Sequence, residues 1–246
     1  MNILLLIIVI LGVALQSVTK KAFNQKTGGG GVYFFSTFSS LAAMLFFVLT
    51  SSKLSFNVEV LPYSVGFGAA YATATVFSVL AVANGSISLS ALMISYSLIL
   101  PTLYGLLFLH DPIGIGLLPG IALLMISLFL MNKKSKVVTI TPKWLMYILL
   151  AFVGNGMCSI VQKVQQIKFD GAYKNEFMIM ALIFVFISMG GMSLFLESKQ
   201  LTTYAKKGWG LGVACGVLNG TVNLFVMILL AAMPASLMFP LITGGG

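Results

Sequence analysis

The chain has few of the side chains that enzymes use for chemistry. It contains no arginine, one histidine, two cysteines and five acidic residues in a length of 246. His110 lies beside Asp111, but no nucleophile is near them to complete a catalytic arrangement. No cluster with the spacing of metal ligands and no nucleotide-binding loop is present. We therefore expect a protein that is not an enzyme, with no catalytic residue, no metal and no cofactor.

Negative charge is scarce, and positive charge comes from lysine alone. Fourteen lysines against five acidic residues give a formal net charge of +9. The lysines lie between apolar stretches or at their ends, where cationic side chains set membrane topology and contact anionic headgroups. This placement favours the lipid bilayer as a partner and argues against nucleic acid.

Polar sequence is too scarce for a soluble domain. Hydrophobic residues make up 59% of the chain, charged residues 8%, and the mean hydropathy is +1.06. A membrane-spanning helix needs about 20 apolar residues, whereas a barrel strand needs about ten of alternating polarity. The apolar stretches here do not alternate, so we predict an all-α, polytopic membrane helix bundle. Nine spans are expected, at residues 3–19, 33–50, 63–84, 86–109, 112–131, 144–162, 177–196, 208–230 and 233–246.

The second half of the chain repeats the first. A first-span pattern returns 142 residues later, with Gly12, Ala14, Ser17 and Lys21 matching Gly154, Gly156, Ser159 and Lys163. Shorter matches follow in later spans at nearly the same offset. We predict two five-helix repeats, residues 1–132 and 144–246, joined by a basic linker at 133–143. An odd number of helices in each repeat inverts one copy relative to the other, as in secondary transporters. The second copy is expected to lack its fifth helix and roughly 30 residues.

Three stretches carry a family resemblance. They are the pattern from Gly12 to Lys21, the run from Ser88 through Pro101 to Pro112, and the run from Pro234 to Gly245. In these stretches the chain resembles the drug/metabolite transporter superfamily, in particular its ten-helix EamA-like members. The resemblance implies a ten-helix transporter fold with a cytoplasmic N-terminus. The small four-helix relatives are known for a glutamate in the first helix, which is absent here, so proton-coupled antiport through such a glutamate is disfavoured.

Polar side chains inside the spans mark the candidate binding site. An amide or a cation within lipid must find a partner, so these residues are expected to face the bundle interior. The candidate substrate-binding residues are Gln16, Lys21, Tyr71, Thr75, Tyr96, Asn155, Gln162, Lys163, Asn219 and Asn223. Interhelical hydrogen bonding and packing explain the amides and tyrosines as well as a cavity does. The two lysines could instead extend to the headgroups.

Glycine and proline residues inside the spans predict where helices pack closely and where they bend. Gly212, Gly216 and Gly220 recur every four residues and form a ridge that lets a neighbouring helix approach closely. Pro101 and Pro240 lie inside the fourth and ninth expected spans, where proline is expected to kink or break a helix.

These observations predict a multi-pass protein of the cytoplasmic membrane that carries small organic metabolites by alternating access, with export the expected direction. The alternative is a membrane protein that binds a partner or lipid without transport. The sequence leaves room for a homodimer. Loops after the first, fifth and seventh spans contain ten lysines and those after the second and sixth contain four. The positive-inside rule therefore places the N-terminus outside, against the orientation that the resemblance implies.

Overall fold

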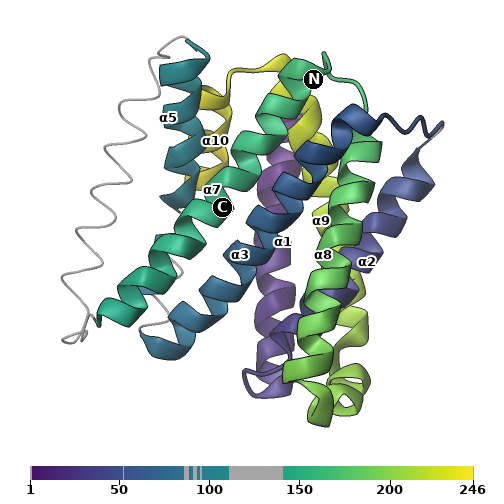
Figure 1. Ribbon diagram of the computed structural model, residues 1–246, viewed down its shortest axis with the longest axis vertical. Helices are drawn as coiled ribbons and strands as arrows, with labels where there is room; N and C mark the ends of the chain where they lie inside the picture. Colours follow the sequence, from purple (N-terminus) through teal and green to yellow (C-terminus); the bar gives the residue numbers. More distant parts are fainter. Residues whose placement is uncertain are drawn as a thin grey trace. The chain divides into compact units, whose positions relative to one another are not determined.

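The structure, a computed structural model, describes residues 2–51, 53–85, 89–90, 93–94, 96–110 and 141–245. All regular structure within these residues is helical, which confirms the all-α prediction for this part of the chain (Figure 1). Six of the helices are long and apolar enough to cross a membrane. The protein is therefore a multi-pass helical membrane protein. The nine spans and their inverted repeat remain predictions.

The six long helices extend beyond the apolar stretches that predicted them. They are α1 (Asn2–Thr27), α2 (Val32–Thr50), α3 (Leu61–Asn84), α7 (Pro142–Lys168), α8 (Lys174–Leu196) and α9 (Leu201–Ala232). Helix α7 begins at Pro142, a residue suited to the first helical turn because its missing N–H has no partner there in any case. Helix α9 begins seven residues before the expected span at 208. Its first turns include Lys206 and Lys207, and lysine is a good helix former.

Within the described residues, two of the expected spans contain only short helical elements. The fourth, 86–109, contains the 3₁₀ turn η2 (Tyr96–Leu98) followed by the ten-residue helix α5 (Ile99–Phe108). Pro101 is the third residue of α5 and lies just after the change from the 3₁₀ turn to the α-helix, within one continuous helical stretch from Tyr96 to Phe108. The ninth, 233–246, contains α10 (Ala235–Gly245). The fifth span at 112–131 and most of the linker at 133–143 lie outside the described residues.

The chain forms two compact units. Unit 1 comprises residues 1–69 and 165–231 together with residue 246, and unit 2 comprises residues 70–164 and 232–245. Helices α3 and α7 contribute residues to both units.

Unit 1 is built around the contact of α2 with α8 and α9 (Figure 1). Its aromatic cluster combines residues of α1, α2 and α9: Phe23, Phe34, Phe35, Tyr204 and Cys215. The glycine ridge of α9 meets α2, as its spacing predicted. A Cβ atom on Gly212 would lie 3.0 Å from Phe38 Cβ, and one on Gly220 would lie 2.6 Å from Phe46 Cδ1. The two helices therefore pack closely because these positions have no side chain.

Glu197, at the end of α8, joins two turns at one end of unit 1. Its Oε1 accepts from the Tyr33 amide at 3.1 Å, and its Oε2 accepts from the Phe34 amide at 2.7 Å. The Ser193 hydroxyl also donates to Oε2 at 3.1 Å. Helix α2 has no cap from its own N-cap residue, Gly31, so the distant carboxylate satisfies amides that the first turn leaves open.

At the opposite end of unit 1, polar contacts join the end of α2 and the segment after it to the first turn of α8. The buried carboxylate of Glu176, in the first turn of α8, accepts from the Ser55 amide at 2.9 Å. The side-chain amide of Asn175 donates to Ser51 Oγ at 2.8 Å. These bonds connect the segment after α2 to the start of α8, so the α2 and α8 termini at this end lie together.

Lysine is distributed unequally between the two ends of unit 1. The end that contains Glu197 has six lysines within about two helical turns of the α1–α2 and α8–α9 connections: Lys20, Lys21, Lys26, Lys199, Lys206 and Lys207. The opposite end has as many acidic residues as basic ones: Lys53, Lys168 and Lys174 with Glu59, Asp170 and Glu176. One end is therefore strongly basic and the other is nearly neutral.

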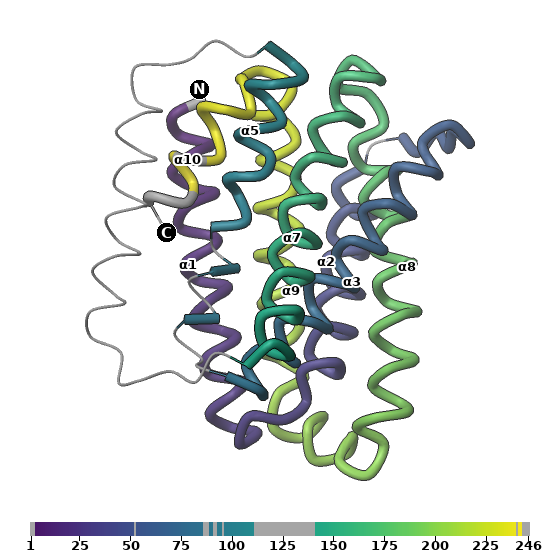
Figure 2. The backbone as a smooth tube through the Cα atoms, turned by 60° about the vertical axis from the view of Figure 1, so that its left-hand side comes forward, coloured from purple at the N-terminus to yellow at the C-terminus, as the bar shows by residue number. Residues whose placement is uncertain are grey.

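Unit 2 combines the later part of α3 with α7, η2, α5 and α10. Helix α10 packs against α5 and η2 (Figure 2). Gly154 of α7 allows a close approach to α3, because a Cβ atom there would lie 2.8 Å from the Ala74 backbone nitrogen. Trp144, at the start of α7, is buried and donates its indole N–H to Ser90 Oγ at 3.0 Å.

Candidate functional site: a buried polar face of helix α7

Helix α7 has four polar residues on one face inside unit 2. Asn155, Ser159, Gln162 and Lys163 follow a spacing of four, three and one, which places them along one side of a helix. Ser159, Gln162 and Lys163 are buried, and Asn155 is half-buried. Helix α7 is long and apolar enough to cross a membrane, and lipid has no groups that hydrogen-bond to polar side chains. Each of these side chains therefore needs a hydrogen-bond partner within the protein.

Asn155 finds its partner in the 3₁₀ turn before α5. Its side-chain amide donates to Ser97 Oγ at 2.6 Å. The neighbouring glycine, Gly156, permits the contact, because a Cβ atom there would lie 2.9 Å from the Ser97 carbonyl oxygen. Tyr96 and Ser97 are both buried in this turn. The close approach of η2 to α7 thus brings an amide and a hydroxyl together at one point on α7.

Lys163 lies further along the same face. Its side chain is 8% exposed, and its Nζ donates to the Met233 carbonyl oxygen at 3.1 Å in the connection between α9 and α10. Lys163 is five positions before the last residue of α7, Lys168, a distance of about 7.5 Å along the axis at 1.5 Å per residue. Lys163 and Glu176 are the buried charged side chains among the described residues. An ammonium group held inside a protein attracts an anionic partner strongly because water is excluded.

The expected cationic pair of Lys21 and Lys163 has unequal environments. Lys21 is exposed on α1, whereas Lys163 is buried in unit 2. Sequence matching placed the two at equivalent positions near the ends of their helices. Burial depends on what packs against each face, and the repeat pattern contains no information on that.

The other expected site residues divide between the units. Tyr71 and Thr75 are half-buried on α3, next to the two alanines, Ala70 and Ala74, whose backbone approaches Gly154. In unit 1, Gln16 of α1 is buried, and Asn223 donates to Asn219 on the same helix, to both the backbone and the side-chain oxygen, at 2.9 Å. Unit 2 thus contains six of the ten: Tyr71, Thr75, Tyr96, Asn155, Gln162 and Lys163. Unit 1 contains Gln16, Lys21, Asn219 and Asn223.

Sequence reasoning missed two buried amides beyond the expected end of the sixth span. Gln165 and Gln166 are 0% and 2% exposed. Gln165 donates to the Ala172 carbonyl oxygen at 3.1 Å, and Gln166 donates to Gln165 Oε1. Gln166 Oε1 accepts no hydrogen bond within the described residues. The signal was the run of glutamines itself, which lies past residue 162 and was assigned to a loop.

Metal ions require sets of ligands that lie close together. Among the described residues, no group of three histidine, cysteine or acidic side chains lies close enough to hold a metal ion. Cys158 and Cys215 are buried and are not joined in a disulfide, and small buried thiols of this kind pack as apolar residues. The α7 face itself presents hydrogen-bonding groups and one positive charge.

No model of a protein family matches the chain, and no curated protein matches it.

Proposed function

We propose that this protein is a secondary carrier of small organic solutes in the cytoplasmic membrane, of the drug/metabolite transporter type, and that it works by alternating access. The observation that carries the proposal is the buried face of α7, above all Lys163. Ionisable groups inside membrane helices are costly and usually mark the path of a solute or an ion. Six apolar helices supply the membrane context, and no chemical step is needed.

The α7 face suits a solute with a carboxylate. Lys163 Nζ donates to the backbone oxygen of Met233 at 3.1 Å, a contact that a carboxylate oxygen would replace with a stronger, charge-assisted one. Asn155 and Ser97 supply a second polar point on the same helix face. A solute that binds one of two conformations more tightly than the other shifts the populations of the two conformations. Alternating access needs such a difference in affinity and no covalent step. Anionic or zwitterionic metabolites, such as amino acids and small organic acids, are the proposed substrates.

Solute flux in reconstituted vesicles tests this proposal. Vesicles containing the protein are loaded with a radiolabelled mixture of amino acids and small dicarboxylates, and efflux is followed with and without external solute. We expect Lys163→Met to reduce flux by about tenfold or more, equivalent to at least ~1.4 kcal/mol of lost interaction. Lys163→Arg should retain part of the flux because the charge remains.

Lys21→Met is the matched control, since Lys21 occupies the corresponding place in the repeat but is exposed. It should leave flux near the level of the unaltered protein. Flux in Lys163→Met that equals both Lys21→Met and the unaltered protein would remove Lys163 from the site. A folded protein that moves none of these solutes would favour the alternative, a membrane protein that binds a partner or lipid without transport.

The unequal ends of unit 1 predict the orientation of the protein. The basic end, with the α1–α2 and α8–α9 connections, should face the cytoplasm by the positive-inside rule, so the N-terminus should be outside. We expect a membrane-impermeant maleimide added to intact cells to label Phe56→Cys and to leave Gln25→Cys unlabelled. Both positions are exposed, and the native cysteines are buried, which keeps the background low. The opposite labelling pattern would support the cytoplasmic N-terminus that the family resemblance implies.

A further inference from the structure

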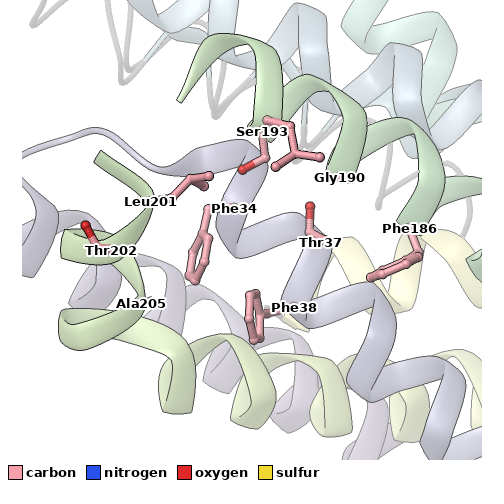
Figure 3. Close-up of a pocket in the computed structure, with 10 residues that line it drawn as sticks. Phe34, Thr37, Phe38, Phe186, Gly190, Ser193, Leu201, Thr202 and Ala205 are labelled. Atoms are coloured by element: carbon pink, nitrogen blue, oxygen red, sulfur yellow. The ribbon is translucent and has the colours of Figure 1, made fainter. Parts of the chain in front are cut away.

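Unit 1 has an open apolar groove between α2, α8 and the start of α9. Its volume is about 400 Å³. Figure 3 shows Phe34 and Phe38 of α2 on one side of this space and Phe186 of α8 on another. The α8 wall runs from Phe186 to Leu194, eight residues or about 12 Å along the helix axis. The groove is therefore about 12 Å long on its α8 side and apolar, which suits a hydrocarbon chain.

One end of this groove reaches the basic end of unit 1. Thr202, in the first turn of α9, is exposed and lines the groove (Figure 3). Lys206 follows Thr202 by four residues and so lies on the same side of α9. Six lysines and one carboxylate, Glu197, are found at this end, and both oxygens of that carboxylate already accept backbone amides. Among the described residues, this end of unit 1 therefore has an excess of five positive charges, six lysines against the one carboxylate.

We infer that this groove binds one acyl chain of an anionic phospholipid, whose headgroup contacts Thr202 and Lys206. Charge complementarity identifies the occupant, because a second copy of the chain would bring the same six lysines to the same place. The groove also lies along two helices of membrane-spanning length, where lipid is the surrounding solvent. The inference does not depend on solute transport, because its residues belong to unit 1 and the α7 face belongs to unit 2.

The charge component can be tested with neighbouring lysines. Lys206 is on the groove side of α9, and Lys207 is about 100° further around the helix and away from it; both are exposed. The protein is reconstituted into phosphatidylcholine vesicles, and electron spin resonance measures how much spin-labelled phosphatidylglycerol or phosphatidylcholine it immobilises. We expect phosphatidylglycerol to be preferred by about fivefold. Lys206→Gln should abolish most of that preference, and Lys207→Gln should retain it.

The groove component can be tested with neighbouring glycines of α8. A Cβ atom on Gly190 would meet Thr37 Cγ2 at 3.5 Å, an ordinary contact, so a larger side chain there extends into the groove rather than into the backbone. Gly191 has open space around it and does not line the groove. Gly190→Leu should reduce the immobilised fraction of phosphatidylglycerol at least to the phosphatidylcholine level, and Gly191→Leu should not. Ala205→Leu fills the same groove from α9 and provides a second variant if Gly190→Leu does not fold.

Three results would overturn the inference. The first is equal immobilisation of the two lipids by the unaltered protein. The second is an equal loss in Lys206→Gln and Lys207→Gln, which would indicate a diffuse surface charge rather than a site. The third is a dimer in crosslinking that disappears in Gly190→Leu but persists in Gly191→Leu, because the groove would then be occupied by a second copy.

Discussion

Replacing Gly216 by valine is expected to separate α2 from α9 and to lower the free energy of unfolding by about 3 kcal/mol. A Cβ atom at this position would overlap the Ser39 carbonyl oxygen and lie 2.6 Å from Ala42 Cβ. The obstacle is mostly backbone, which cannot rotate away as a long side chain can. The helices would have to move apart, and the contacts of the whole seam would weaken with them.

Gly210→Val on the same helix is the matched control. A Cβ atom there meets nothing within 4 Å, so the substitution should change stability by less than about 0.5 kcal/mol. Unfolding of both variants can be followed by circular dichroism in mixed micelles as the fraction of denaturing detergent rises. If Gly216→Val unfolds at the same detergent fraction as Gly210→Val, the close seam between α2 and α9 does not exist in the folded protein.

Replacing Glu197 by alanine is expected to cost about 3 kcal/mol of folding free energy. The carboxylate accepts two amides of the first turn of α2 and one hydroxyl. Hydrogen bonds to a charged group contribute about 1.5–3 kcal/mol each, but Glu197 is only half-buried, so water replaces part of this contribution and the expected net loss stays below the sum of the three bonds. The negative charge also favours the N-terminal end of the α2 dipole. Without it, the Tyr33 and Phe34 amides would have no partner from this end of α8.

Glu197→Gln retains the shape of the side chain and removes its negative charge, so it measures the contribution of the charge alone. It retains one acceptor oxygen and should cost about half as much as the alanine variant. Glu59→Ala is the control, since Glu59 is exposed, and its effect should be within about 0.5 kcal/mol. The same detergent titration measures all three. Near-native stability of Glu197→Ala would show that water caps α2 as well as the carboxylate does.

Much of the fold could be predicted because lipid imposes a simple rule on sequence. A segment long and apolar enough to cross the bilayer must be a helix, and six such segments form helices here. The close packing of the glycine ridge was also predictable, since it depends on local backbone chemistry. Helix ends were predicted less well. The apolar stretch marks the part of a helix inside lipid, whereas α9 continues through Lys206 and Lys207 outside it.

The candidate site was predictable in its residue types and not in its geometry. Composition indicated that polar residues in spans need partners, and Asn155 has one in Ser97. Which partner each finds depends on helix packing, which a single sequence does not encode in any short pattern. The contrast between buried Lys163 and exposed Lys21 is the clearest case. The apolar groove was missed for a related reason: its wall residues are ordinary span residues, and only their arrangement leaves space between them.

The contact between Glu197 and α2 constrains how the protein is made. The Tyr33 amide and the carboxylate that caps it are 164 residues apart in the chain. At a synthesis rate of 5–20 residues per second, α2 would wait roughly 8–33 s on the ribosome before that carboxylate is made. During this interval its first turn must be satisfied by water or by the insertion machinery. The α1–α2 hairpin is therefore a temporary intermediate of biogenesis, and its starting turn is completed only when the α8–α9 connection arrives.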